Sequence, residues 1–214
     1  MTKVLILGAS GQIARHVIQD IAGDDSISMT LFVRDAGKLS STPRNASVVQ
    51  GDVLDRSALD AAMEGQDVVY ANLTGENLDD QARSVIASMH AAGVKRLIFV
   101  LSLGIYDEVP GKFGEWNRQT IGEDLKPFRR AGDAIEASGL DYTILRPAWL
   151  TDEDEIDYET SQKGEPFRGT VVSRKSVADL IATIIRSPAK QLHTNLGVNK
   201  PGTDADKPYF ISQG

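Results

Sequence analysis

The chain has 214 residues, 41% of them hydrophobic and 25% charged, which suits one folded domain and excludes a disordered protein. A formal net charge of −7 disfavours nucleic acid and anionic membranes as general partners. The sequence has no cysteine, which excludes disulfides, thiolate nucleophiles and cysteine metal sites and agrees with a cytoplasmic location.

Apolar runs recur along the chain and predict strands that are covered on both faces, as in a mainly parallel sheet. No run reaches the roughly 20 residues that span a bilayer, and no secretory signal is recognisable at the start. The six main runs are residues 4–7, 29–33, 47–50, 68–71, 97–101 and 142–145, and shorter strands are predicted at 168–173 and 192–198.

Amphipathic segments alternate with these runs and predict helices. Asp55 is expected to cap the second helix and Gly93 to end the third. The helices are expected at 12–22, 55–64, 78–92, 126–137 and 176–186. The alternation predicts an α/β fold: a single Rossmann-like, doubly wound domain over residues 1–214. Within it, residues 103–120 form a loop, and 146–214 form the substrate-side cap and tail.

A glycine motif follows the first strand and predicts a dinucleotide site. Gly8 permits the tight turn, Gly11 allows the backbone to approach a diphosphate, and an alanine at position 14 keeps the helix close to the sheet. The helix N-terminus offers free N–H groups and the positive end of its dipole. Ser10, Gln12 and Ile13 are included among the expected cofactor-binding residues.

The end of the second strand is where such a fold selects its cofactor. Arg34 comes first after the apolar run, and its planar guanidinium suits a 2′-phosphate, with Lys38 near enough to assist. These residues favour NADP over NAD. The alternative is that Asp35 turns inward and accepts from a ribose hydroxyl.

Three further residues at strand ends are expected to contact the cofactor. Asp52 can accept from the adenine amino group while Val53 packs against the ring. Asn72 is expected near the ribose and the nicotinamide, because ligands bind at the carboxyl edge of such sheets. Each of these residues is also compatible with an ordinary cap or turn.

Together these segments resemble the atypical, NmrA-like, NAD(P)H-binding branch of the short-chain dehydrogenase/reductase superfamily. The matching segments are residues 8–14, 33–35, 51–53, 101–106, 138–147 and 172–178. The resemblance implies a Rossmann-like fold and a nicotinamide cofactor. It leaves the reaction open, because such proteins include reductases of flavins, quinones and carbonyls, sugar-nucleotide enzymes and redox sensors.

The superfamily's usual catalytic Tyr-x-x-x-Lys pair does not occur in this sequence. The helix expected to carry it has Phe128, which cannot donate a proton, and Arg129 or Arg130 near the lysine position. Ser102, at the end of the fifth strand, and Tyr106 are the candidate catalytic residues. Both are also compatible with purely structural roles.

The segment 106–117 is predicted to be a long aromatic loop beside the nicotinamide, with Trp149 as a further apolar wall. The acidic run 152–159 is interpreted as a solvated loop rather than a metal site. The three isolated histidines do not suggest a metal site either.

The sequence predicts an NADP(H)-dependent reductase of a small carbonyl, quinone or flavin. The alternative is a non-catalytic redox sensor that acts through a protein partner. A nucleotide-sugar epimerase is disfavoured, because the chain is short for the extra substrate subdomain. The expected partner is a small-molecule substrate, not nucleic acid or a membrane, and both monomer and dimer remain open.

Overall fold

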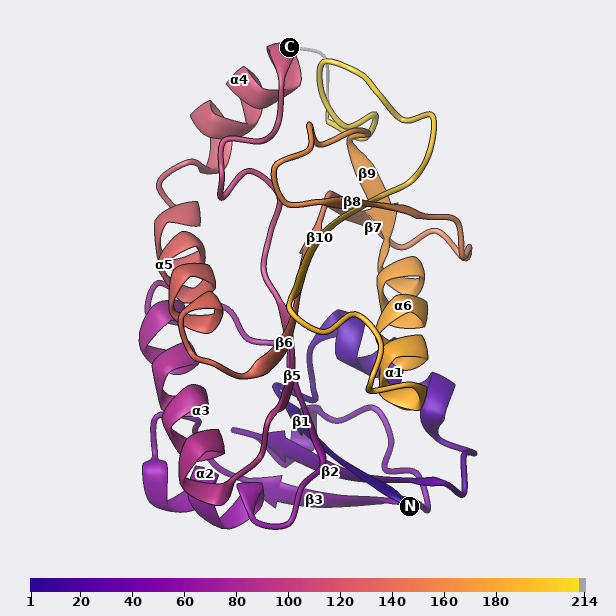
Figure 1. Ribbon diagram of the computed structural model, residues 1–214. Coiled ribbons are helices and arrows are strands. Elements are labelled where there is room, and N and C mark those ends of the chain that lie inside the picture. Colours follow the sequence, from indigo (N-terminus) through magenta and orange to yellow (C-terminus); the bar gives the residue numbers. More distant parts are fainter. Residues whose placement is uncertain (212–214) are drawn as a thin grey trace.

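The computed structural model describes residues 1–211 and contains one eight-stranded sheet and one two-stranded sheet (Figure 1). The large sheet has the order β3-β2-β1-β4-β5-β6-β10-β8 and is parallel except for β8, which runs antiparallel to β10. In chain order the strands are β1 (Thr2–Leu7), β2 (Ile27–Val33), β3 (Ala46–Gln50), β4 (Val68–Ala71), β5 (Arg96–Val100), β6 (Asp141–Pro147), β7 (Trp149–Thr151), β8 (Glu159–Gln162), β9 (Val171–Ser173) and β10 (Thr194–Asn199).

Helices cover both faces of the large sheet, so the fold is the predicted doubly wound α/β arrangement (Figure 1). One face carries α1 and α6, and the other carries α2, α3 and α5. The helices are α1 (Gln12–Ile21), α2 (Arg56–Met63), α3 (Leu78–Ala92), α4 (Gly111–Ile121), α5 (Leu125–Glu136) and α6 (Arg174–Arg186), with a short 3-10 helix at Ala36–Lys38. Among the described residues, no helix has the length and apolar character needed to cross a membrane.

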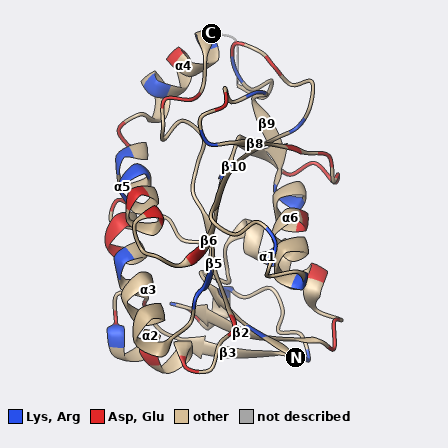
Figure 2. Cartoon of the chain, in the orientation of Figure 1, with Lys and Arg blue, Asp and Glu red and all other residues tan. Residues whose placement is uncertain are grey.

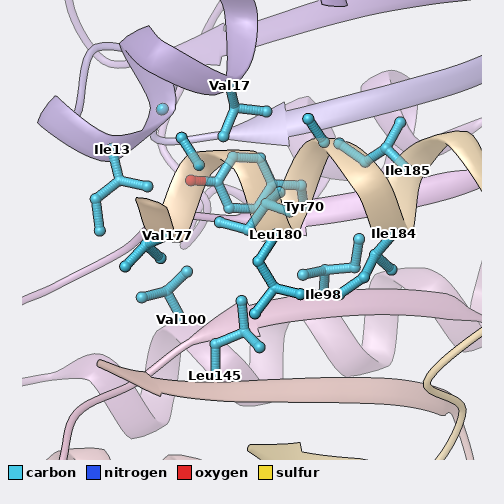
Figure 3. Close-up of a cluster of buried hydrophobic side chains, with 14 of the residues drawn as sticks. Ile13, Val17, Tyr70, Ile98, Val100, Leu145, Val177, Leu180, Ile184 and Ile185 are labelled. Carbon is cyan, nitrogen blue, oxygen red and sulfur yellow. The ribbon is translucent and has the colours of Figure 1, made fainter. Parts of the chain in front are cut away.

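Strand β1 shows why the apolar runs are continuous. Val4 and Ile6 belong to the core under α1 and α6, whereas Leu5 and Leu7 belong to the core under the other helices. Successive side chains of a strand point to opposite faces, so a strand covered on both sides needs apolar residues at every position. Figure 3 shows the core under α1 and α6, where side chains of both helices and of the sheet pack around Tyr70.

The predicted helix ends agree with local signals. The Asp55 side chain accepts hydrogen bonds from the backbone N–H groups of Ser57 and Ala58 and caps α2, as predicted. Helix α3 ends at Gly93, which adopts the left-handed conformation (φ +70°) that glycine tolerates best. The surfaces of α5 and α6 that face solvent carry charges of both signs (Figure 2).

Two predictions about the substrate side are wrong. Residues 103–120 are not one loop, because Gly111 begins helix α4. Gly114 makes this helix possible, since a Cβ there would lie 1.9 Å from the carbonyl oxygen of Val109. The side chain of Phe113 packs into the core and is 7% exposed, which holds the helix against the domain. Of the strand predicted at 168–173, only Val171–Ser173 is extended, and it pairs with the unpredicted β7.

The acidic run from Asp152 reaches β8, which begins at Glu159, and most of its length is the predicted exposed loop. Asp152 pairs with Arg174 (2.9 Å) and Asp154 with Lys175 (2.6 Å) at the start of α6. Residues 200–206 of the tail predicted over 199–214 contact residues 169–171 and Lys112 of α4, and residues 212–214 lie outside the described part.

Candidate functional site

A tight turn connects β1 to α1. Gly8 has a positive φ of +73°, and its N–H and that of Ala9 both donate to the carbonyl oxygen of Phe32 on β2 (3.1 and 3.3 Å). The N–H of Gly11 then donates to the carbonyl oxygen of Gly8 at 2.9 Å. The turn therefore places the start of α1 directly above the carboxyl edge of the sheet.

Asn72, which follows β4, fills the space that the two glycines leave. A Cβ at Gly8 would lie 2.1 Å from the carbonyl oxygen of Asn72, and a Cβ at Gly11 would lie 1.9 Å from its Nδ2. The hydroxyl of Tyr70 donates to Asn72 Oδ1 at 3.1 Å, and burial raises the pKa of Tyr70, so this donor stays protonated. The two glycines thus make room for Asn72, which lies against the turn between β1 and α1.

The N-terminus of α1 fits an anionic ligand. Gly11 is its N-cap, and within residues 1–211 no side chain accepts from its first N–H groups. The first turn, Gln12 to Arg15, contains no carboxylate to offset the positive end of the helix dipole. A dinucleotide diphosphate supplies the acceptors and the negative charge that this position lacks.

A cavity of about 730 Å³ opens at this edge of the sheet. It is lined by eight of the ten residues predicted to bind the cofactor: Gly8, Ser10, Gly11, Arg34, Lys38, Asp52, Val53 and Asn72. Gln12 and Ile13 are not among its lining residues. The Ile13 side chain points into the core between α1 and α6 (Figure 3), so only its backbone N–H is available to a phosphate.

Two cations beside β2 line the cavity. Arg34 directly follows the strand, Lys38 ends the short 3-10 helix, and both side chains are exposed. Neither forms an ion pair with any described residue. Asp35 instead caps the 3-10 helix, with Oδ1 accepting from the N–H of Gly37 at 2.9 Å. This arrangement leaves positive charge available to a phosphate group.

The opposite wall comes from the loop after β3. Asp52 Oδ1 accepts from the N–H of Leu54 at 2.9 Å, which leaves its other oxygen for a ligand. The ring of Phe32 forms part of the cavity wall beneath Gly51, where a Cβ would lie 2.7 Å from the ring. The carbonyl oxygen of Val53 accepts from Ser84 on α3, so this loop is fixed to the helix layer.

Sequence reasoning missed the residues between β4 and α3. Gln81 donates through Nε2 to the carbonyl oxygen of Thr74 (2.9 Å) and to Asn77 Oδ1 (2.8 Å), and it holds this loop at the cavity. Polar residues around Gly75, which has φ +124°, were the available signal for a ligand loop. Asp35, the alternative ribose contact, also lines the cavity, and the lining residues not predicted are Phe32, Val33, Gly51, Leu54, Leu73, Thr74, Gly75, Asn77 and Gln81.

Ser102 and Tyr106 lie outside the residues that line this cavity. Ser102 is half-buried just beyond β5, and the N–H of its neighbour Leu103 donates to the carbonyl oxygen of Pro147 at 3.1 Å. The Tyr106 hydroxyl accepts from Asn195 Nδ2 at 2.9 Å. Burial, together with the charge of Glu136, raises the pKa of Tyr106 to about 12. Tyr106 is therefore a weaker acid than a free tyrosine.

Helix α5 has two arginines near the position expected for the catalytic lysine, and the Arg129 guanidinium lies 5.0 Å from the centroid of the Tyr106 ring. On α5, Arg129 pairs with Asp133 at 3.0 Å, and Arg130 pairs with Asp79 of α3 at 2.8 Å. The arginines near the expected lysine position therefore contact carboxylates on the helix layer and are not among the cavity residues.

Comparison with known proteins agrees with this geometry. The sequence profile of the NAD(P)H-binding family matches residues 8–188. A solved Rossmann-fold NAD(P)-binding family protein from Shigella flexneri is 60% identical, with 99% of this chain and 100% of that protein covered and a TM-score of 0.86. A short-chain dehydrogenase/reductase from Veillonella parvula, solved in complex with NADP, is 26% identical, with 98% and 99% covered and a TM-score of 0.88.

A curated relative from Bacillus subtilis (strain 168) is described as an uncharacterized sugar epimerase. It is 28% identical over 209 residues, which cover 86% of this chain and 87% of that protein. The Veillonella parvula protein is described as a dehydrogenase/reductase and the Bacillus subtilis relative as a sugar epimerase, so the two descriptions name different chemistry.

Proposed function

The chain belongs to the NAD(P)H-binding family, in the atypical, NmrA-like branch of the short-chain dehydrogenase/reductase superfamily, and from this premise we propose that it is an NADP(H)-dependent reductase of a small carbonyl, quinone or flavin. The observation that carries the cofactor choice is the position of Arg34 and Lys38 in the cavity wall. Both cations line the cavity without an ion-pair partner among residues 1–211, while Asp35 is engaged by the turn.

The residues of the cavity suggest how the cofactor is oriented. Arg34 and Lys38 bind the 2′-phosphate, the α1 N-terminus binds the diphosphate, and Asp52 accepts from the adenine amino group. Asn72, held by Tyr70, directs its Nδ2 toward the phosphate-binding turn. This orientation directs the other end of the cofactor along the carboxyl edge toward Ser102, which follows β5, the strand beside β4.

The bound cofactor supplies a hydride, that is, two electrons with one proton, so the reduced product needs a second proton from elsewhere. Ser102 is the side chain proposed to hydrogen-bond the substrate oxygen. Tyr106 is a poor proton donor because burial raises its pKa to about 12. An acceptor that delocalises the developing charge, such as a quinone or a flavin, takes its proton from water.

The cofactor choice is tested by titrating NADPH and NADH against the wild type and Arg34→Ala. Loss of a charged phosphate contact should weaken NADPH binding by roughly 1.5–3 kcal/mol, which is tenfold or more, and should leave NADH binding nearly unchanged. Arg44→Ala is the control, because Arg44 is exposed, pairs with Asp25 and does not line this cavity. Tighter NADH than NADPH binding by the wild type would overturn the proposal.

A redox sensor acting through a protein partner is the second candidate, and the missing Tyr-x-x-x-Lys pair favours it. The two functions separate in a turnover assay with NADPH and a panel of quinones, flavins, aliphatic carbonyls and a nucleotide sugar. Oxidation of NADPH above the protein-free rate, reduced in Ser102→Ala, supports the reductase. Tight NADPH binding without turnover of any compound supports the sensor.

A further inference from the structure

Two amide side chains, Asn77 and Gln81, line the cofactor cavity where helix α3 begins. Asn77 is the N-cap of that helix, and Gln81 lies one turn later. Gly75 brings the loop after β4 close to both, because it has a φ of +124° and a Cβ there would lie 3.2 Å from Asn77 Oδ1. We call Asn77 and Gln81 the amide pair.

Hydrogen bonds fix which atoms of the amide pair remain free. Gln81 Nε2 donates to the carbonyl oxygen of Thr74 at 2.9 Å, and because a carbonyl oxygen can only accept, the amide nitrogen must lie on that side. Nε2 also donates to Asn77 Oδ1 at 2.8 Å. Gln81 Oε1 and Asn77 Nδ2 are left, and neither forms a hydrogen bond with any residue of the described part. The amide pair thus offers one acceptor and one donor at the cavity.

Helix α3 places the amide pair beside the loop that carries Asp52. Ser84 comes three residues after Gln81, and residues at that spacing share one face of a helix. The Ser84 hydroxyl donates to the carbonyl oxygen of Val53, which joins this face of α3 to the Asp52 loop. Asp52 keeps one oxygen free, because Leu54 N–H binds the other. The Leu54 side chain is 45% exposed and lines the same cavity, so it offers a base an apolar surface.

Adenine carries the groups that match these free atoms. Asn and Gln side chains recognise adenine by accepting from its N6 amino group and donating to N7. The amide pair supplies that acceptor and that donor from two neighbouring side chains. The amino group has a second hydrogen, on the side away from N7, and the free oxygen of Asp52 can accept it. Hypoxanthine has an oxygen in place of the amino group, so both acceptors would lose their hydrogen bonds.

We propose that Gln81 is a specificity-determining residue for the base of the cofactor. Its Oε1 accepts a hydrogen bond from the adenine amino group, and Asn77 Nδ2 donates to N7. This inference rests on the proposed function, because it concerns the cofactor that the proposed reductase uses. The amide pair makes the cavity prefer an adenine dinucleotide to the same dinucleotide with hypoxanthine.

The proposal is tested by calorimetric titration of the protein, without substrate, with NADPH and with its hypoxanthine analogue. We expect the wild type to prefer NADPH roughly a hundredfold, because both Gln81 and Asp52 lose a hydrogen bond to the analogue. Gln81→Met keeps the length of the side chain but removes the acceptor, so the preference should fall to roughly tenfold. If Gln81 only held the loop, Gln81→Met would weaken both cofactors equally, and that unchanged ratio would overturn the proposal.

Asn77→Asp should behave differently from Gln81→Met. The aspartate keeps an acceptor for Gln81 Nε2 but replaces the free donor with a second acceptor. Because both bases have N7, the affinities for both cofactors should fall about tenfold and their ratio should be kept. Wild-type affinities in Asn77→Asp would contradict the contact with N7. Gln119→Met is the control that should change neither affinity, because Gln119 is exposed on α4 and does not line the cavity.

Failure of this inference is distinguishable from failure of the proposed function. Equal binding of NADPH and its hypoxanthine analogue by the wild type, together with turnover, contradicts the base contact and supports the reductase. The expected base preference without turnover of any acceptor supports the base contact and contradicts the reductase. Binding of neither cofactor contradicts both.

Discussion

Glu108 and Arg146 form a buried ion pair that joins the loop after β5 to the end of β6. Their side chains are 5% and 1% exposed. The Glu108 carboxylate also accepts from the backbone N–H groups of Gly104 and Tyr106, both at 2.9 Å. Arg146 in turn donates to Asn195 on β10 at 2.7 Å. This network holds the loop that carries the candidate catalytic residues against the sheet.

Breaking this pair should be costly. Glu108→Gln leaves the Arg146 charge buried without a counter-ion, and we expect the free energy of unfolding to fall by about 3–5 kcal/mol. The control is Asp25→Asn, which breaks the Arg44–Asp25 pair, whose side chains are 73% and 86% exposed. That change should cost less than about 1 kcal/mol. Urea denaturation measures both, and equal losses would show that burial of the Glu108–Arg146 pair has no consequence.

The contact between Gly8 and Asn72 predicts that alanine costs more stability at position 8 than at a glycine with free space around it. Gly8→Ala adds a Cβ against a backbone carbonyl and also forces alanine to a positive φ. Gly65→Ala is matched, because Gly65 has a φ of +74° but a Cβ at this position would meet no atom within 4 Å. We expect a loss of about 1–2 kcal/mol for Gly65→Ala, and roughly 1–3 kcal/mol more for Gly8→Ala. Thermal or urea unfolding compares them, and a similar loss in both would contradict the steric argument.

The Asp79–Arg130 pair between α3 and α5 predicts a pH dependence. The hydrogen bond from Arg130 holds the pKa of the Asp79 carboxyl below its ordinary value of 3.8. A lowered folded pKa means that the contribution is present at neutral pH and is lost as the pH falls through that folded pKa. Asp79→Asn should therefore lower stability by about 1 kcal/mol at pH 7, and its difference from the wild type should shrink as the pH falls below 3.8 through the lowered folded pKa.

Asp80→Asn is the control for that measurement, because Asp80 lies in the same helical turn but its side chain is 70% exposed. We expect the free energy of unfolding of Asp80→Asn to follow that of the wild type closely as the pH is lowered from 7. Urea denaturation at a series of pH values gives all three curves. A wild-type advantage over Asp79→Asn that persists undiminished in acid would contradict the assigned role of the ionised carboxylate.

Much of the fold could be predicted because its signals are local. The strands of the large sheet are covered on both faces, so β4 and the last four residues of β1 are all buried apolar residues. Asp55 and Gly93 mark helix ends through bonds and backbone angles within one turn. The residues that line the cofactor cavity could be predicted for the same reason, since the motif glycines and Arg34 occupy fixed places after their strands.

Helix α4 could not be predicted, because its glycines are typical of loops and only the approach of Val109 to Gly114 makes a glycine necessary there. The same limit applies to Gln81 and Thr74, which reach the cavity because α3 packs beside the loop after β4. It also applies to Tyr106, whose hydroxyl meets Asn195, 89 residues along the chain.

The sequence by itself determined the parallel α/β fold and the presence of a dinucleotide site, because strand burial, helix caps and the glycine turn depend on neighbouring residues. Only the tertiary structure decided what surrounds that site. It directed Ile13 into the core, placed Asn72 against the glycines and brought Trp116 to Trp149. Those contacts join residues far apart in the chain, and the packing of whole helices on the sheet determines which of them meet.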